Sequence, residues 1–146
     1  MKRNIRNEVY ETNSSSVHSI VVMDSGLESS KFELDDEGYI VVPFGKFGKD
    51  VEYFTEQEDK LSYLITKLYY ETGWDIEDIV NSYEFHYLEE AIMSYVDGCL
   101  GIKIDTSIEP EIDHQSNYKD FIDWYDADAV IGFVFGKYIA LKTSCD

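Results

Sequence analysis

The chain contains little cysteine and no long apolar run. Its two cysteines, Cys99 and Cys145, stand in no C-x-x-C pair and at no metal-ligand spacing. We therefore expect reduced thiols rather than a disulfide. No apolar stretch approaches the roughly 20 residues of a membrane span, and the basic N-terminus runs into polar sequence without the apolar region of a signal peptide. These absences predict a cytoplasmic protein with no membrane partner.

Positive charge is also scarce. The 146 residues hold 12 lysines and arginines against 30 aspartates and glutamates, a net charge of -18. Residues 1–31 are neutral, so the whole excess lies in residues 32–146, where 8 bases face 26 acids. Such a body repels nucleic acid and attracts basic surfaces. The alternative interpretation is that the charge serves solubility alone.

Aromatic residues, by contrast, are plentiful, with 12 tyrosines, 8 phenylalanines and 2 tryptophans. Tyrosine is common both in cores and on binding surfaces. The length predicts one acidic domain over residues 1–146, with a polar N-terminal segment at 1–16. A chain of this length can bury a substantial core.

The order of predicted elements is strands, then helices, then strands. Residues 17–23, 39–42 and 100–104 are expected strands, and 51–54 a short extended piece. Helices are expected from Thr55, from Asp75, around 88–95 and over 118–124. Residues 130–135 and 138–141 are expected to form a hairpin around Gly136-Lys137. We therefore expect an α+β fold, in which a mainly antiparallel sheet of N-terminal strands and the C-terminal hairpin is covered by the helical middle segment.

A dense polar block precedes the first strand. Hydroxyls, an amide and an imidazole lie close together there, and a turn of such residues suits a phosphate or carboxylate. The alternative is a turn that satisfies its own backbone, with His18 and at least two neighbouring polar residues hydrogen-bonded locally. The candidate ligand-binding residues are Thr12, Asn13, Ser14, Ser15, Ser16, His18 and Ser19, with Arg3 and Arg6 adding charge.

The same opening, with its short basic start and E-T-N-S-S-S-x-H-S block, resembles small uncharacterised proteins of phages and Gram-positive bacteria. The resemblance covers about the first twenty residues. It implies that Asn13 to Ser16, His18 and Ser19 form a unit, and it suggests a phage or mobile-element setting. It implies no particular activity.

Enzymatic chemistry has weak support in the sequence. Ser16 and His18 would share a strand face, but no G-x-S-x-G elbow accompanies them. His18, His86 and His114 share no i, i+4 spacing, and the glycines of residues 45–49 lack the phosphate-loop pattern. We expect no catalytic residues, no metal and no cofactor.

The C-terminal third carries a second candidate site, in which acidic residues lie beside aromatic ones. One interpretation is an ordinary solvated face. The other is a surface that fits a basic groove, because carboxylates on one helix face lie about 5–6 Å apart, comparable with the phosphates of a nucleic acid. The candidate partner-binding residues are Glu109, Glu111, Asp113, Asp120, Asp123, Trp124, Tyr125, Asp126 and Asp128.

These patterns favour a non-enzymatic, phage-related acidic protein that binds a basic site on a host protein and inhibits a nucleic-acid-processing or defence enzyme. No direct binding of nucleic acid is expected. The alternative is a nucleotide-binding or small-anion-binding module built on residues 12–19.

Overall fold

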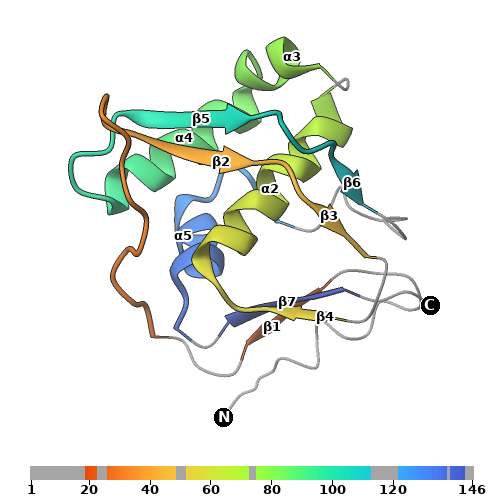
Figure 1. Ribbon diagram of the computed structural model, residues 1–146. Coiled ribbons are helices and arrows are strands. Elements are labelled where there is room, and N and C mark those ends of the chain that lie inside the picture. Colours follow the sequence, from red (N-terminus) through yellow and green to blue (C-terminus); the bar gives the residue numbers. More distant parts are fainter. Residues whose placement is uncertain are drawn as a thin grey trace.

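The computed structural model describes residues 19–22, 26–48, 52–72, 75–112, 122–137 and 139–143. Strands and helices alternate irregularly along the chain (Figure 1). The strands are β1 (Ser19–Val22), β2 (Tyr39–Pro43), β3 (Lys46–Phe47), β4 (Glu52–Phe54), β5 (Gly101–Asp105), β6 (Glu111–Ile112) and β7 (Ile139–Thr143). The helices are α2 (Gln57–Thr72), α3 (Ile76–Val80), α4 (Tyr83–Tyr95) and α5 (Ala127–Phe135).

Helix α2 is the centre of the molecule. All residues from 61 to 68 are buried, so the helix is enclosed on every side over two turns. It packs against β2, β6, α3 and α5. A helix enclosed in this way can keep polar residues only where each one finds a hydrogen-bond partner or an opposite charge.

The polar side chains of α2 link it to its neighbours. Ser62 donates to the carbonyl of Pro43 at 2.7 Å, and Thr66 accepts from the amide of Gly45 at 3.0 Å. Lys60 donates to the carbonyl of Ile139 at 2.9 Å, although its side chain is fully buried. These bonds fasten the end of β2 and the start of β7 to one helix.

The strands form three small sheets. The first has the order β1-β7-β4 and is antiparallel throughout. The others are the parallel pairs β2-β5 and β3-β6, which follow one another along the same two chain segments (Figure 1). Parallel strands need long connections, and here the connection from β2 to β5 contains α2, α3 and α4.

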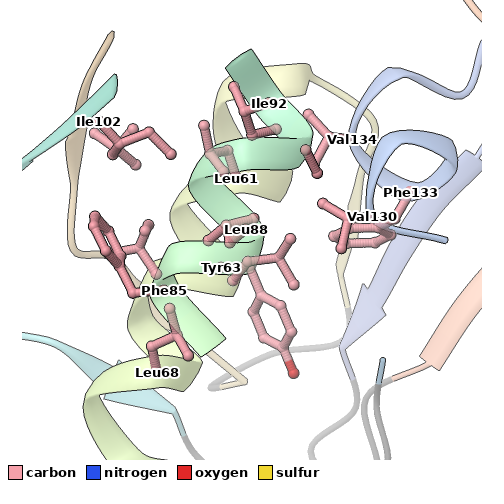
Figure 2. Close-up of a cluster of buried hydrophobic side chains, with 14 of the residues drawn as sticks. Leu61, Tyr63, Leu68, Phe85, Leu88, Ile92, Ile102, Val130, Phe133 and Val134 are labelled. Atoms are coloured by element: carbon pink, nitrogen blue, oxygen red, sulfur yellow. The ribbon is translucent and has the colours of Figure 1, made fainter. Parts of the chain in front are cut away.

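The main core lies between α2, α4 and α5. Figure 2 shows Leu61 of α2, Leu88 and Ile92 of α4, and Val134 of α5 within one cluster. All four side chains are fully buried. Burial of this apolar surface is what holds α4 and α5 in fixed positions, each leucine, isoleucine or valine contributing about 1.5–3 kcal/mol.

The mixed helix-and-strand class predicted from the sequence is confirmed, and the first strand pairs with the last in an antiparallel sheet. The predicted C-terminal hairpin is wrong. Residues 127–135 form helix α5, because Asp126 caps it by accepting from the amide of Ala129 and its apolar residues recur at helical spacing. The second predicted strand is also placed differently, since β2 pairs with β5 in a separate parallel sheet.

Other local predictions have mixed outcomes. Asp75 caps α3 as expected, accepting from the amide of Glu77, and Cys99 is a free, buried cysteine. His86 stands between Phe85 and Tyr87, a position that predicts partial burial, but it is exposed. Of the short helix expected over 118–124, the described residues 122–124 are not helical. Within the described ranges, no helix is long and apolar enough to cross a membrane.

Candidate partner-binding surface

The polar block before the first strand lies almost wholly outside the described residues. This applies to Arg3, Arg6, Thr12, Asn13, Ser14, Ser15, Ser16 and His18. Ser19 is the exception: it is 7% exposed and pairs with Lys142 across β1 and β7. The one described member of the block is therefore buried within a sheet.

The acidic candidates fall into two segments attached to the end of α2. Glu109 is exposed after β5 and Glu111 belongs to β6, while Asp113 and Asp120 lie outside the described residues. Tyr70 of α2 donates to the carbonyl of Pro110 at 3.4 Å and accepts from the amide of Ile112 at 3.4 Å.

The second acidic segment is fixed by the next residue of the same helix. Glu71 accepts a hydrogen bond from the indole Nε1 of Trp124 at 3.1 Å. Adjacent residues of α2 thus hold both acidic segments, and the second of them carries the larger group of exposed residues, namely Asp123, Tyr125, Asp126 and Asp128.

The carboxylates of this second segment also shape its turn. Asp123 accepts from the amide of Tyr125 at 3.0 Å, and Asp126 accepts from the amide of Ala129 at 3.2 Å as the cap of α5. Asp128 lies in the first turn of α5, where the helix dipole favours a negative charge. The segment is therefore ordered by the same groups that give it its charge.

The two aromatic residues of the segment point in different directions. Both were expected on the surface, but Trp124 is 5% exposed and Tyr125 is 56% exposed. The indole belongs to the hydrophobic core and has its donor satisfied by Glu71, which accounts for its burial. Only Tyr125 is available as an exposed ring.

Helix α4 adds residues that sequence reasoning missed. The ring of Tyr87, on this helix, packs edge-to-face against the ring of Tyr125, with the centroids 4.8 Å apart and the planes at 77°. Tyr83, one turn earlier, is 75% exposed. The signal in the sequence is the i, i+4 spacing of the two tyrosines. The helix was expected only around residues 88–95, however, and the spacing does not reveal which segment lies opposite.

The surroundings of Tyr125 are negatively charged. Partial burial raises the pKa of the Tyr125 phenol, and Glu84, Tyr87 and Asp123 raise it further. Within the described part of the chain, neither Glu84 nor Asp123 forms an ion pair. We call Tyr83, Glu84, Tyr87, Glu90, Asp123, Tyr125, Asp126 and Asp128 the tyrosine-acid face.

A recess opens in this face between α4 and the turn before α5. Its volume is about 230 Å³. The lining residues are Tyr87, Glu90, Ala91, Ser94, Trp124, Tyr125 and Ala127. Two larger hollows, of about 550 and 560 Å³, lie along residues 29–35 on other parts of the molecule.

Two lysines that would offset the negative charge are placed in the interior. Lys60 and Lys67 are both fully buried in α2. Burial lowers the pKa of Lys60 to about 8, with Glu28 and Glu56 opposing the shift. Burial lowers the pKa of Lys67 to about 7, with Glu71 opposing it. The outer surface is therefore more acidic than the sequence total indicates.

The described residues include no group of three or more histidines, cysteines or acids that could hold a metal ion. No protein family, curated protein or solved structure matches this chain. Its function is therefore inferred from the charge and geometry of its surfaces.

Proposed function

We propose that this chain is a non-enzymatic interaction protein that binds a basic site on another protein through its tyrosine-acid face. The observation that carries the proposal is the contrast between this face and the interior. Exposed carboxylates and tyrosine rings are gathered along α4 and the start of α5, while Lys60 and Lys67 are enclosed in α2.

The charge of the face matches a partner with clustered lysine and arginine. Carboxylates along Glu84, Glu90, Asp123, Asp126 and Asp128 produce a negative potential that accelerates encounter with a basic surface. Exposed tyrosines add apolar contact area at a low cost in conformational entropy. Tyrosine is enriched at protein interfaces, and the charges around the rings would contribute specificity and a faster encounter.

A basic groove that normally holds phosphates is the partner site that this pattern suits best. Carboxylates on a helix and its cap can take the places of phosphates on a nucleic-acid strand, because both present closely spaced negative charge to a basic groove. The resemblance of the first residues to phage proteins adds a host nucleic-acid-processing or defence enzyme as the class of partner.

The test is capture of host proteins on the immobilised full-length chain at low and high ionic strength. Exposed charges are screened over about 8–10 Å near physiological salt, so high salt should release the partner. A duplex oligonucleotide added at low salt should also release it, because both ligands would occupy one basic groove. A variant in which Glu84, Asp123 and Asp128 are changed to the corresponding amides should capture much less.

Two results would contradict the proposal. One is the recovery of no basic protein at low salt. The other is a partner whose capture resists both salt and oligonucleotide and is unchanged in the amide variant, since such binding would use a different surface.

A further inference from the structure

The recess in the tyrosine-acid face has two walls. One wall is a single face of α4, where Tyr87, Glu90, Ala91 and Ser94 follow the i, i+3, i+4, i+7 spacing. The other wall is the turn before α5. Its volume of about 230 Å³ is below the roughly 300–1,000 Å³ of sites for drug-sized ligands. The recess therefore suits one protruding side chain rather than a whole small molecule.

Small residues keep the recess open. Ala91 is 2% exposed on the α4 wall, and Ala127, the first residue of α5, is exposed on the opposite wall. A longer aliphatic side chain at either position would project into the hollow. The recess thus depends on two alanines, and a larger side chain at the exposed Ala127 would fill it.

The lining selects a cation. The rings of Tyr87 and Tyr125 both line the recess and stand at 77° to each other, so a planar group can stack on only one of them. Ring faces carry negative quadrupole density, and they attract ammonium or guanidinium groups within about 6 Å. Trp124 contributes only its ring, because its Nε1 donates to Glu71.

Acceptors complete the lining. Glu90 is an exposed carboxylate on the recess wall, and the Ser94 hydroxyl donates its proton to the carbonyl of Ala91 at 2.7 Å. That bond leaves the Ser94 oxygen as an acceptor. No lysine or arginine lines the recess among the described residues.

We infer that this recess receives an arginine side chain of the basic partner, with the guanidinium stacked on one of the two tyrosine rings and donating to Glu90. Arginine is preferred to lysine because a planar guanidinium stacks on rings and donates within its plane to a carboxylate. The inference rests on the proposed function and names the contact at the centre of that interface.

The test is a titration of the full chain with a hexa-arginine peptide. Binding is measured from NMR shifts of the backbone amides and of the Trp124 indole. Tyr125→Ala should weaken peptide binding by about two- to thirty-fold, the equivalent of a cation–π contact of 0.5–2 kcal/mol. The matched control is Tyr53→Ala, which removes a ring that is 59% exposed on β4. Glu90→Gln should weaken binding more than Glu77→Gln, which removes an exposed carboxylate from α3.

Filling the recess provides an independent variant. Ala127→Leu retains every charge and places its side chain in the hollow, so it should weaken hexa-arginine binding by a similar factor without changing the salt dependence. A hexalysine peptide should bind more weakly than hexa-arginine to the parent chain and be nearly unaffected by the filled recess.

The outcomes separate the recess from the wider proposal. If hexa-arginine binds with salt sensitivity but Tyr125→Ala and Ala127→Leu behave like Tyr53→Ala, the recess is not the arginine site, while a basic partner remains supported. Equal affinity for hexalysine would overturn the preference for a guanidinium. If neither hexa-arginine nor any host protein binds at low salt, the proposed function fails as well.

Discussion

Two groups of aromatic rings in this protein share one geometry and differ in their surroundings. In the interior, Phe47 packs edge-to-face with Phe54 at 5.3 Å and with Tyr63 at 5.1 Å between centroids. On the surface, Tyr87 and Tyr125 pack in the same way at 4.8 Å. Phe47 is 5% exposed, whereas the two surface rings are 44% and 56% exposed.

The comparison shows that ring geometry alone does not separate a core from a binding surface. The interior rings are enclosed by α2, β3 and β4, so their contribution is burial of apolar area. The surface rings have carboxylates beside them and a recess between their supporting elements. Their arrangement leaves contact area for a second molecule.

The strongest way to test this difference is to remove one ring from each group. Phe47→Ala should reduce the free energy of unfolding by about 3–5 kcal/mol, because it leaves a cavity among buried rings. Tyr125→Ala should reduce it by at most about 1.5 kcal/mol, the contribution of one exposed ring pair. Urea unfolding of both variants beside the parent chain measures the two values. Similar losses in both variants would remove the distinction between the groups.

A second prediction concerns the interior cation Lys60, whose Nζ lies 5.9 Å from the centroid of the Phe133 ring. Lys60 has a pKa of about 8 in the folded chain against an ordinary value of 10.5. Between these pH values the unfolded chain keeps a proton that the folded chain has released, so deprotonation favours folding. The stability of the parent should therefore rise as the pH increases through this window, and Lys60→Met should show a smaller rise.

The measurement is urea unfolding at several pH values between 7 and 10. The upper limit matters because burial raises the pKa of Tyr63 well above 10.0, so tyrosine ionisation in the unfolded chain would oppose the trend above that value. Lys67, with a pKa of about 7, also makes stability rise with pH, but it does so equally in the parent and in Lys60→Met. If the parent and Lys60→Met have the same pH dependence, folding does not lower the pKa of Lys60, and the prediction is wrong.

The local elements were predictable where one residue decides them. Asp75 caps α3 through the amide of Glu77, as a short polar side chain before an apolar run indicates. The predicted hairpin failed because residues 130–135 are rich in β-branched and aromatic residues, which also suit a buried helix. The Asp126 cap and the i, i+3, i+4 spacing of Val130, Phe133 and Val134 outweighed that propensity.

The candidate surface was only half predictable for a related reason. The acids and Tyr125 are adjacent in sequence, so their concentration is visible there. Tyr87 and Glu90 come from a helix more than 30 residues earlier, and only tertiary packing of α4 against α5 brings them to the same recess. Nothing in the sequence distinguishes the buried Lys60 from a solvated lysine, because its partners are the carbonyls of Gly136 and Ile139.

A third prediction concerns Trp124, which connects the interior to the surface rings. Trp124→Phe keeps an aromatic ring and removes the hydrogen bond to Glu71, so it should cost about 1–3 kcal/mol of stability. Its effect on hexa-arginine affinity should be smaller than that of Tyr125→Ala, since the exposed rings remain. Thermal unfolding and peptide titration on the same samples give both values. A variant that loses binding but no stability would place Trp124 with the surface group instead.

The smallest expected effect separates the two roles of Asp126, which caps α5 and adds charge to the tyrosine-acid face. Asp126→Ala removes both and should cost about 1 kcal/mol of stability, whereas Asp126→Asn keeps an equally good cap and should change stability by less than about 0.5 kcal/mol. Both variants lose one negative charge, so both should weaken hexa-arginine binding to the same small extent. If the asparagine variant binds like the parent while the alanine variant does not, Asp126 acts on the partner only through the capping oxygen that holds the turn before α5, and its charge contributes nothing to the interface.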